Sequence, residues 1–474
     1  MKGMTGLLVA LAVAGCGTIY EARKAQSEVA PKGVGVAGGA GRVNLRGSTL
    51  EQLVGFAMTN RPTVVSAALA VEDARLAMRE LAADAPVVST TPWLSPKISA
   101  GGGYAASSAP AKLSDLEWKT EGNASASLSL DLLIWDFGRH SAQMDAAAEN
   151  VIAAEAELAS AGYQVFEDVA SAYFNLLGAD ALLEVALTNE NEYALHEQYA
   201  EERLRSGEAQ RLDVTRAKLD LSQARQATVL ASNTVSTCAA ELMKALGIDA
   251  AHGTRDDVLL PMPDSISAVM QGFGETKYDV AWAFELARTN TPFMAERRAR
   301  LRAASARVDA AVANLYPSVS ASVSLSWADP LWAWSWGVNA VQTIFQGFRK
   351  TTAVDRAVNA MKSAASAVDE AEQQLSLQLE LAVTARDDAL KARETAWHSV
   401  LAARENLDTV KAQYAEGYAS RVDFTDAVGD FASAAGSCIK AYYGGQIAEA
   451  KLFALIGRMP EFRERKISER KMLK

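Results

Sequence analysis

The chain carries an internal repeat, and this repeat constrains the fold more than any other feature of the sequence. Two short patterns recur at a separation of about 210 residues. They are a glycine followed six residues later by an aspartate, at Gly207 to Asp213 and at Gly417 to Asp423, and an aliphatic residue followed by glycine, at Leu246-Gly247 and at Ile456-Gly457. A constant register over this length indicates one supersecondary unit that occurs twice.

The outer parts of the repeat are looser. Trp135-Asp136-Phe137-Gly138-Arg139 has a partial echo in Ile344-Phe345-Gln346-Gly347, and Asn60-Arg61-Pro62 reappears as Asn290-Thr291-Pro292 at a wider separation. A linker between the copies must absorb the difference. We therefore expect a first repeat at 48–250, a linker at 251–279, a second repeat at 280–457 and a basic, solvated tail at 458–474.

The first residues have the features of an export signal. Lys2 precedes an apolar stretch that runs through Ala14. Val13-Ala14-Gly15-Cys16 also resembles a bacterial lipobox, in which Cys16 is lipidated; an ordinary signal peptide with an incidental cysteine is the alternative. Gly17, in place of an aspartate, favours the outer membrane over the inner one. We expect a lipoprotein signal peptide at 1–15 and a flexible tether rich in Gly and Ala at 16–47.

Composition excludes several classes of protein. The 474 residues carry a net charge of −10, which argues against nucleic acid as a partner. No apolar run of about 18 residues follows the N-terminus, so no transmembrane helix is expected. Cys238 and Cys438 are interpreted as small buried residues, and the four histidines lack ligand spacing. We expect no metal site, no cofactor and no enzyme, because no nucleophile–base set, metal cluster or nucleotide loop is present.

Proline placement predicts where the long helices lie. All twelve prolines fall outside two windows, one between Pro110 and Pro261 and one between Pro330 and Pro460. Apolar residues in these windows step by three and four, for example Val165, Val169, Ala172 and Leu176. We predict helices at about 139–206, 209–246, 348–416 and 418–456, joined in pairs at hairpin tips marked by Gly207 and Gly417.

The other half of each repeat is predicted to be a β-hairpin. Residues 318–327 alternate without a fault, with five serines on one face and Val, Ala, Leu and Trp on the other. We predict strands at about 318–327 and 332–342, with weaker counterparts at about 97–106 and 123–134. The fold class is thus mainly α with a smaller β part, in which a β-hairpin and a pair of long coiled-coil helices occur twice.

These strands suit a membrane barrel. Each is about ten residues long, which matches a bilayer crossing at barrel tilt. A soluble sandwich is the alternative, but the polar face is small and hydroxylated, and four tryptophans cluster at one end like an aromatic girdle: Trp327, Trp332, Trp334 and Trp336. Open sheet edges do not survive in hydrocarbon, and four strands cannot close a barrel. Several chains must therefore share one barrel, in a number that strand counting leaves open.

The order, duplication and spacing of these segments resemble the TolC-like outer-membrane efflux proteins from about residue 48 to residue 457. The segments that carry the resemblance are Asn60-Arg61-Pro62, Trp135-Asp136-Phe137-Gly138-Arg139, the passage from Arg203 to Val214 and its echo from Tyr414 to Phe424. The resemblance implies a lipid-anchored homotrimer in the bacterial outer membrane, with a 12-stranded β-barrel and a periplasmic α-helical barrel. It also implies two partners, a periplasmic adaptor (membrane fusion) protein and an inner-membrane pump of the RND or ABC type.

The resemblance further implies a gate at the periplasmic end. Asp423 and Asp426 match a pair of gate aspartates, while Asp213 and Tyr414 match residues that latch the closed state. The family's latch arginine falls at Ala419 here, with Arg421 nearby, so the latch is arranged differently. Helix capping is the alternative role for the aspartates. The hairpin tips, with Arg205, Gly207, Gly417 and Ser420, are expected to contact the adaptor.

The predicted function is a passive outer-membrane duct of a tripartite efflux or type I secretion system. The alternative from another class is a lipid-anchored periplasmic scaffold or adaptor that does not span the membrane. Such a scaffold would keep the helices and the export signal, but it would not need serine-alternating strands that end in tryptophans.

Overall fold

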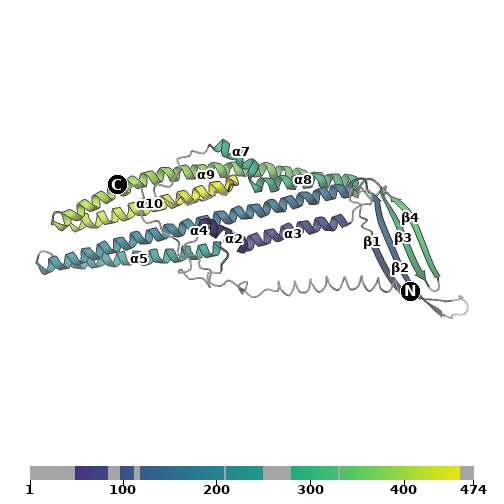
Figure 1. Cartoon of the computed structure of the whole chain (residues 1–474), viewed down its shortest axis with the longest axis horizontal. Helices are drawn as coiled ribbons and strands as arrows, with labels where there is room; N and C mark the ends of the chain where they lie inside the picture. Colours follow the sequence, from purple (N-terminus) through teal and green to yellow (C-terminus); the bar gives the residue numbers. More distant parts are fainter. Residues whose placement is uncertain are drawn as a thin grey trace.

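The protein is described by a computed structural model, which defines residues 49–83, 97–110, 118–207, 210–248, 279–328 and 331–458. The expected signal peptide with Cys16, the tether and most of the linker and the tail lie outside these residues. Figure 1 shows an elongated molecule in which all the helices run roughly along one axis and four strands extend from one end.

Two long helical hairpins form the body. The first pairs α4 (Arg139–Arg205) with α5 (Arg211–Ala245), and the second pairs α9 (Arg349–Ala415) with α10 (Arg421–Ile456). Each long helix has 67 residues, which is about 100 Å at 1.5 Å per residue. At the tips Gly207 and Gly417 have φ of 81° and 83°, a left-handed conformation that glycine adopts without strain. The elements lie within a few residues of the ranges expected from proline placement.

Four further helices were not among the expected elements. They are α2 (Leu50–Asn60), α3 (Pro62–Ala83), α7 (Val280–Asn290) and α8 (Pro292–Ala313). Pro62 and Pro292 are the first residues of α3 and α8, where the missing N–H would have no helical partner anyway. The search for windows free of proline thus overlooked α3 and α8, which begin at a proline, and the short α2 and α7, which lie just before them.

The repeated motifs meet in space within each copy. Gly247, just after α5, lies against the backbone of Asn60 and Arg61, and Gly457, just after α10, lies against Asn290 and Thr291. As a result α5 continues end to end toward α3, and α10 toward α8, alongside the long helices α4 and α9 (Figure 1). In each copy, the Asn-x-Pro motif and the aliphatic-Gly motif are thus in contact where the ends of two helices meet.

Replacing Gly457 with alanine is expected to destabilise the fold by about 3 kcal/mol. The residue has φ 73°, which costs an L side chain about 1–2 kcal/mol, and an added Cβ would lie 3.0 Å from the Asn290 carbonyl oxygen. Thermal unfolding followed by circular dichroism measures the loss. Gly429→Ala is the control, because Gly429 lies inside α10 with open space around it, and its replacement should be neutral or stabilising.

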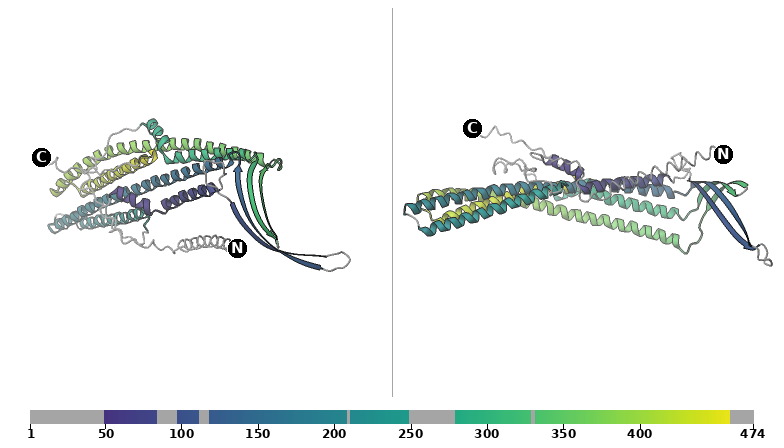
Figure 2. Two further views of the ribbon diagram at one scale, coloured as in Figure 1. Left: turned by 45° about the vertical axis from the view of Figure 1, so that its right-hand side comes forward. Right: turned by 90° about the horizontal axis from the view of Figure 1, so that it is seen from below.

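The strands form one antiparallel sheet in the order β1-β2-β3-β4. Their bounds are Lys97–Pro110, Trp118–Trp135, Ser318–Ala328 and Leu331–Val341. The first two are longer than the expected 97–106 and 123–134. Figure 2 shows the sheet curving away from the helices, with β1 and β2 extending beyond β3 and β4. The sheet therefore has two open edges, one along β1 and one along β4.

The core lies between the helices and is built from small and aliphatic side chains. The predicted stripe on α4 is buried at Val165, Val169, Ala172 and Leu176. Of the described helices, α4 alone has a stretch apolar enough to cross a bilayer by length and composition. It packs against α3, α5, α8 and α10, so this stretch serves the core.

Candidate functional site

The sheet has one largely apolar face and one face of small residues on which serines are concentrated in β2 and β3. The register pairs Leu128 with Leu325 and Leu325 with Trp334 on the apolar side. On the other side Ser129 pairs with Ser324, and Ser324 with Ser335. The serines bond to one another across strands, with Oγ–Oγ distances of 2.6 Å for Ser99 and Ser129 and 2.8 Å for Ser324 and Ser335. Such a sheet can face lipid on one side and water on the other.

The four tryptophans share the apolar face but do not share one level. Trp327 and Trp332 are cross-strand partners beside the β3–β4 turn, with ring centroids 6.3 Å apart. Trp334 and Trp336 follow along β4 at every second position, so Trp336 lies about 13 Å from Trp332 at 3.3 Å per residue. Only the first pair sits at the end of the strands, where a girdle would lie.

The junction of strands and helices is held by the Trp135–Arg139 motif. Phe137 and Gly138 have φ of 55° and 86°, which turns the chain from β2 into α4. The buried Asp136 carboxylate accepts a 2.7 Å hydrogen bond from the His140 backbone N–H and lies 3.9 Å from Arg139. Its Oδ2 thereby caps a helix that has no other side-chain cap.

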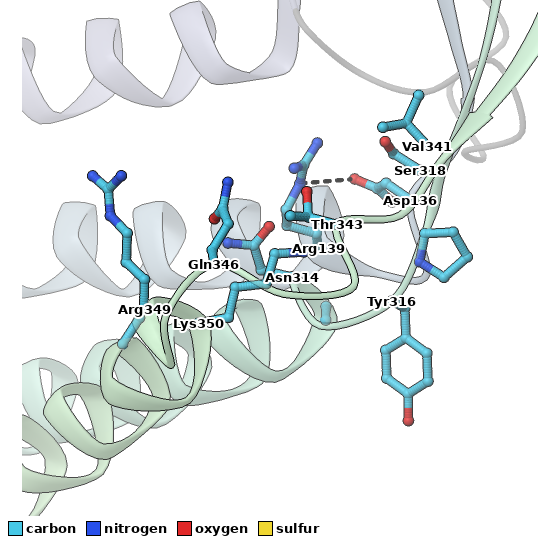
Figure 3. Close-up of a pocket in the computed structure, with 13 residues that line it drawn as sticks. Asp136, Arg139, Asn314, Tyr316, Ser318, Val341, Thr343, Gln346, Arg349 and Lys350 are labelled. Carbon is cyan, nitrogen blue, oxygen red and sulfur yellow. Dashed lines mark ion pairs between the residues drawn. The ribbon is translucent and has the colours of Figure 1, made fainter.

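A polar cavity of about 450 Å³ opens at this junction (Figure 3). It lies between the starts of α4 and α9 and the end of α8, and its charged lining residues are Asp136, Arg139, Arg349 and Lys350. The echo of the motif turns β4 into α9 in the same way, through Gly347 and Phe348 at φ 57° and 63°. The repeat therefore builds two equivalent strand-to-helix turns.

Two of the predicted gate and latch residues, Asp423 and Asp213, cap the short helices at the hairpin tips. Asp423 accepts hydrogen bonds from the backbone N–H and the hydroxyl of Ser420, at 2.9 and 2.7 Å. These bonds lower the pKa of Asp423, which therefore stays ionised. Asp213 accepts a 3.0 Å bond from the backbone N–H of Gln210 in the same position of the first copy. Asp426 is exposed on α10 one turn further on.

The two hairpins are tied together close to their tips. Arg421 at the start of α10 forms a 2.6 Å ion pair with Asp220 on α5, and Lys411 on α9 forms one of the same length with Glu192 on α4. The carboxylate that Arg421 contacts is thus Asp220, seven residues beyond the latch candidate Asp213. Sequence reasoning noted Arg421 but could not identify its partner.

An aromatic cluster lies beside this ion pair. The His196 ring of α4 stacks on Phe424 of α10 at 5.0 Å and lies 5.2 Å from Tyr414 of α9. Tyr414 also hydrogen-bonds Arg203 and lies within electrostatic reach of Asp213, while burial raises its pKa. The latch candidates Tyr414 and Asp213 are therefore near each other, and His196, which the sequence showed only as an isolated histidine, lies at the centre of the contact.

His196 is 1 % exposed, and neither ring nitrogen has a hydrogen-bond partner among the described residues. Burial lowers the pKa of the imidazole, an effect that Asp220 opposes and Arg421 reinforces. The ring is consequently held neutral between the two hairpins. Within the described ranges no three His, Cys, Asp or Glu side chains gather as a possible metal site.

Comparison with known proteins identifies the family. The model of the outer membrane efflux protein family matches residues 53–248 and 283–458, which make up most of the chain. The chain belongs to the outer membrane efflux protein family. A search among curated proteins found no match.

Solved structures show the same fold. CusC, whose crystal structures concern folding and transmembrane channel formation, superposes with a TM-score of 0.74 at 20% identity, over 87% of this chain and 93% of CusC. VceC from Vibrio cholerae superposes with a TM-score of 0.71 at 17% identity, over 86% of this chain and 96% of VceC. The open state of MtrE from Neisseria gonorrhoeae superposes with a TM-score of 0.70 at 18% identity, over 86% of this chain and 89% of MtrE. The predicted TolC-like family and fold class are confirmed.

The protein is thus an outer-membrane efflux channel whose helices extend into the periplasm. The sheet lies at one end of the molecule, and the hairpin tips lie at the opposite end (Figure 1). This identification favours the channel over the non-spanning scaffold, because the family and its solved members are outer-membrane channels.

Proposed function

We propose that three copies of this efflux channel form one passive duct, with a shared 12-stranded barrel and a periplasmic helical tunnel. The open edges of the sheet carry this proposal. β1 and β4 each present unpaired backbone groups within the membrane part, and each unsatisfied group costs several kcal/mol in hydrocarbon. Pairing β4 of one protomer with β1 of the next removes every edge.

The dimensions agree with a bilayer crossing. β3 and β4 have 11 residues each, which at barrel tilt span about 28 Å, close to the apolar band of about 25 Å of outer-membrane barrels. The apolar face then points to lipid, and the serine rows line the lumen. The pair Trp327 and Trp332 would lie in the aromatic girdle at the outer interface, with Trp334 and Trp336 reaching into the apolar band.

The full-length chain purified in detergent is expected to run as a heat-modifiable trimer. Unboiled samples should migrate at three times the chain mass of 50.5 kDa on a denaturing gel, and boiled samples as the monomer. The same material should insert conducting channels into planar bilayers. Monomer in both samples, with no conductance, would contradict the shared barrel.

We further propose that the hairpin tips dock the periplasmic adaptor, which links the duct to an inner-membrane pump of the RND or ABC type. The tip residues Arg205, Gly207, Gly417 and Ser420 are exposed, and Arg205 is 78% exposed at its side chain. Acylation of Cys16 would anchor the chain in the outer membrane, and its replacement by serine should abolish palmitate labelling.

Asp423 and Asp426 are proposed to form an anionic ring at the periplasmic constriction. Both are exposed and lie on the first turns of α10. Threefold symmetry would bring copies of each near the axis, where they attract cations. Asp423→Asn with Asp426→Asn should weaken block by multivalent cations about tenfold in single-channel recordings. Asparagine keeps an oxygen that can accept the Ser420 bonds, so the change tests charge rather than capping. Unchanged block, with an intact trimer, would leave capping as the role of Asp423.

A further inference from the structure

The two hairpin tips share a ten-residue sequence that includes the ion-pairing residues. Segments 211–220 and 421–430 are identical at five positions: Arg211 and Arg421, Asp213 and Asp423, Thr215 and Thr425, Ala217 and Ala427, Asp220 and Asp430. Each copy therefore supplies one arginine at the start of its short helix and one aspartate nine residues later, about two and a half turns along the helix.

A single chain makes only one of the two possible pairs between copies. Arg421 of the second copy bonds Asp220 of the first at 2.6 Å, in a position where both side chains are more than three-quarters buried. Their counterparts Arg211 and Asp430 are exposed, and no ion pair of the described residues involves either of them. At the sites that the repeat makes equivalent, the described part of the chain thus offers no ion-pair partner to Arg211 or to Asp430.

The order of elements places these residues at the junction between protomers. Within a chain, the first copy contacts the second where α4 packs against α8 and α10. The edge strand β4 leads into α9. The edge strand β1 follows α3, and α5 lies end to end with α3 in space. When β4 of one protomer pairs with β1 of the next, α9 of the first lies beside α5 of the second. The contact of α9 with α5 between protomers then has the same arrangement as the contact of α4 with α10 within one protomer.

We propose that Asp430 of one protomer forms an ion pair with Arg211 of the next. The proposal rests on the shared barrel described above and adds to it a contact at the far end of the molecule. Pairs within protomers and pairs between protomers then alternate around the periplasmic end. A closed ring of this kind ties every hairpin to both neighbours, so the tips move together rather than one at a time.

Charge reversal tests the pair in the full-length trimer. Arg211→Asp and Asp430→Arg should each lower the temperature at which the trimer dissociates on a denaturing gel, by several degrees. The two changes together should restore it to within about a degree of the unmodified protein. Arg211→Lys and Asp430→Glu, which keep the charges, should have little effect. Circular dichroism of each variant confirms that the helices are retained.

A cross-link provides a readout that does not depend on stability. In a chain with Cys238 and Cys438 replaced by alanine, Arg211→Cys with Asp430→Cys should give linked dimers and trimers with a short bis-maleimide, and either cysteine alone should not. If the double reversal fails to rescue and the cysteines fail to link while the unmodified protein is trimeric, the ion pair is wrong and the shared barrel stands. If the unmodified protein is monomeric, the barrel itself fails.

Discussion

Arg421→Ala is expected to open the periplasmic end of the channel and to raise its conductance in planar bilayers about tenfold. The 2.6 Å pair of Arg421 with Asp220 holds the second hairpin against the first. Exposed pairs contribute about 0.2–1 kcal/mol, whereas breaking a buried pair costs about 3–5 kcal/mol. With side chains 24% and 19% exposed, we place each pair near 1.4 kcal/mol, which is about a factor of ten per protomer in the ratio of open to closed hairpins.

A matched ion pair on the same helix provides the control. Lys451 of α10 pairs with Glu167 of α4 at 3.9 Å, so it also joins the two hairpins, but far from their tips. Lys451→Ala should leave the conductance unchanged. Asp220→Ala should act like Arg421→Ala, and the exchange of both charges should return the channel to its original conductance. An Arg421→Ala trimer that conducts like the unmodified protein would show that the pair does not hold the tips closed.

The hairpins and strands could be predicted because their signals are local. Proline is absent over more than a hundred residues in each window, and the alternation at 318–327 has period two without exception. The helices α3 and α8 were overlooked because long helices were sought only in the windows free of proline, although proline also starts helices.

The contacts of the candidate gate were less accessible to sequence reasoning. Asp213 and Asp423 could be placed beside their glycines, and capping follows from that spacing. The partner of Arg421 lies 201 residues away and is selected by how two hairpins cross, which no local pattern encodes. His196 had no motif at all, because its neighbours Tyr414 and Phe424 come from other helices. The available signal was the repeat itself, which aligns Arg421 with Arg211 and Asp220 with Asp430.

Acidification is expected to loosen the contact between the hairpins through His196. Asp220 of α5 and Arg421 of α10 act on the imidazole directly, and Tyr414 of α9 packs against it. Asp426 of α10 acts on the neighbouring Tyr193 of α4, and Arg203 of α4 and Asp213 of α5 act on Tyr414. Burial is the largest effect on the imidazole and lowers its pKa. The packed state therefore binds fewer protons than an opened state in which the ring is hydrated. The contribution of His196 to the stability of the packed state is fully present above the ordinary imidazole pKa of about 6.5. This contribution is lost as the pH falls below that value.

Channel conductance should consequently rise when the bath is taken from about pH 7.5 to about pH 5.5, a range that spans the ordinary pKa of imidazole and lies above the ordinary pKa of carboxylates. His196→Phe should keep the ring stacked on Phe424 and remove this rise, because phenylalanine fills a similar volume and cannot bind a proton. His398→Phe, at an exposed histidine of α9 outside this cluster, should leave the rise intact. A His196→Phe channel with the full acid response would assign the response to another group. A loss confined to His196→Phe would show that a buried, neutral imidazole controls how tightly the two halves of the repeat hold each other.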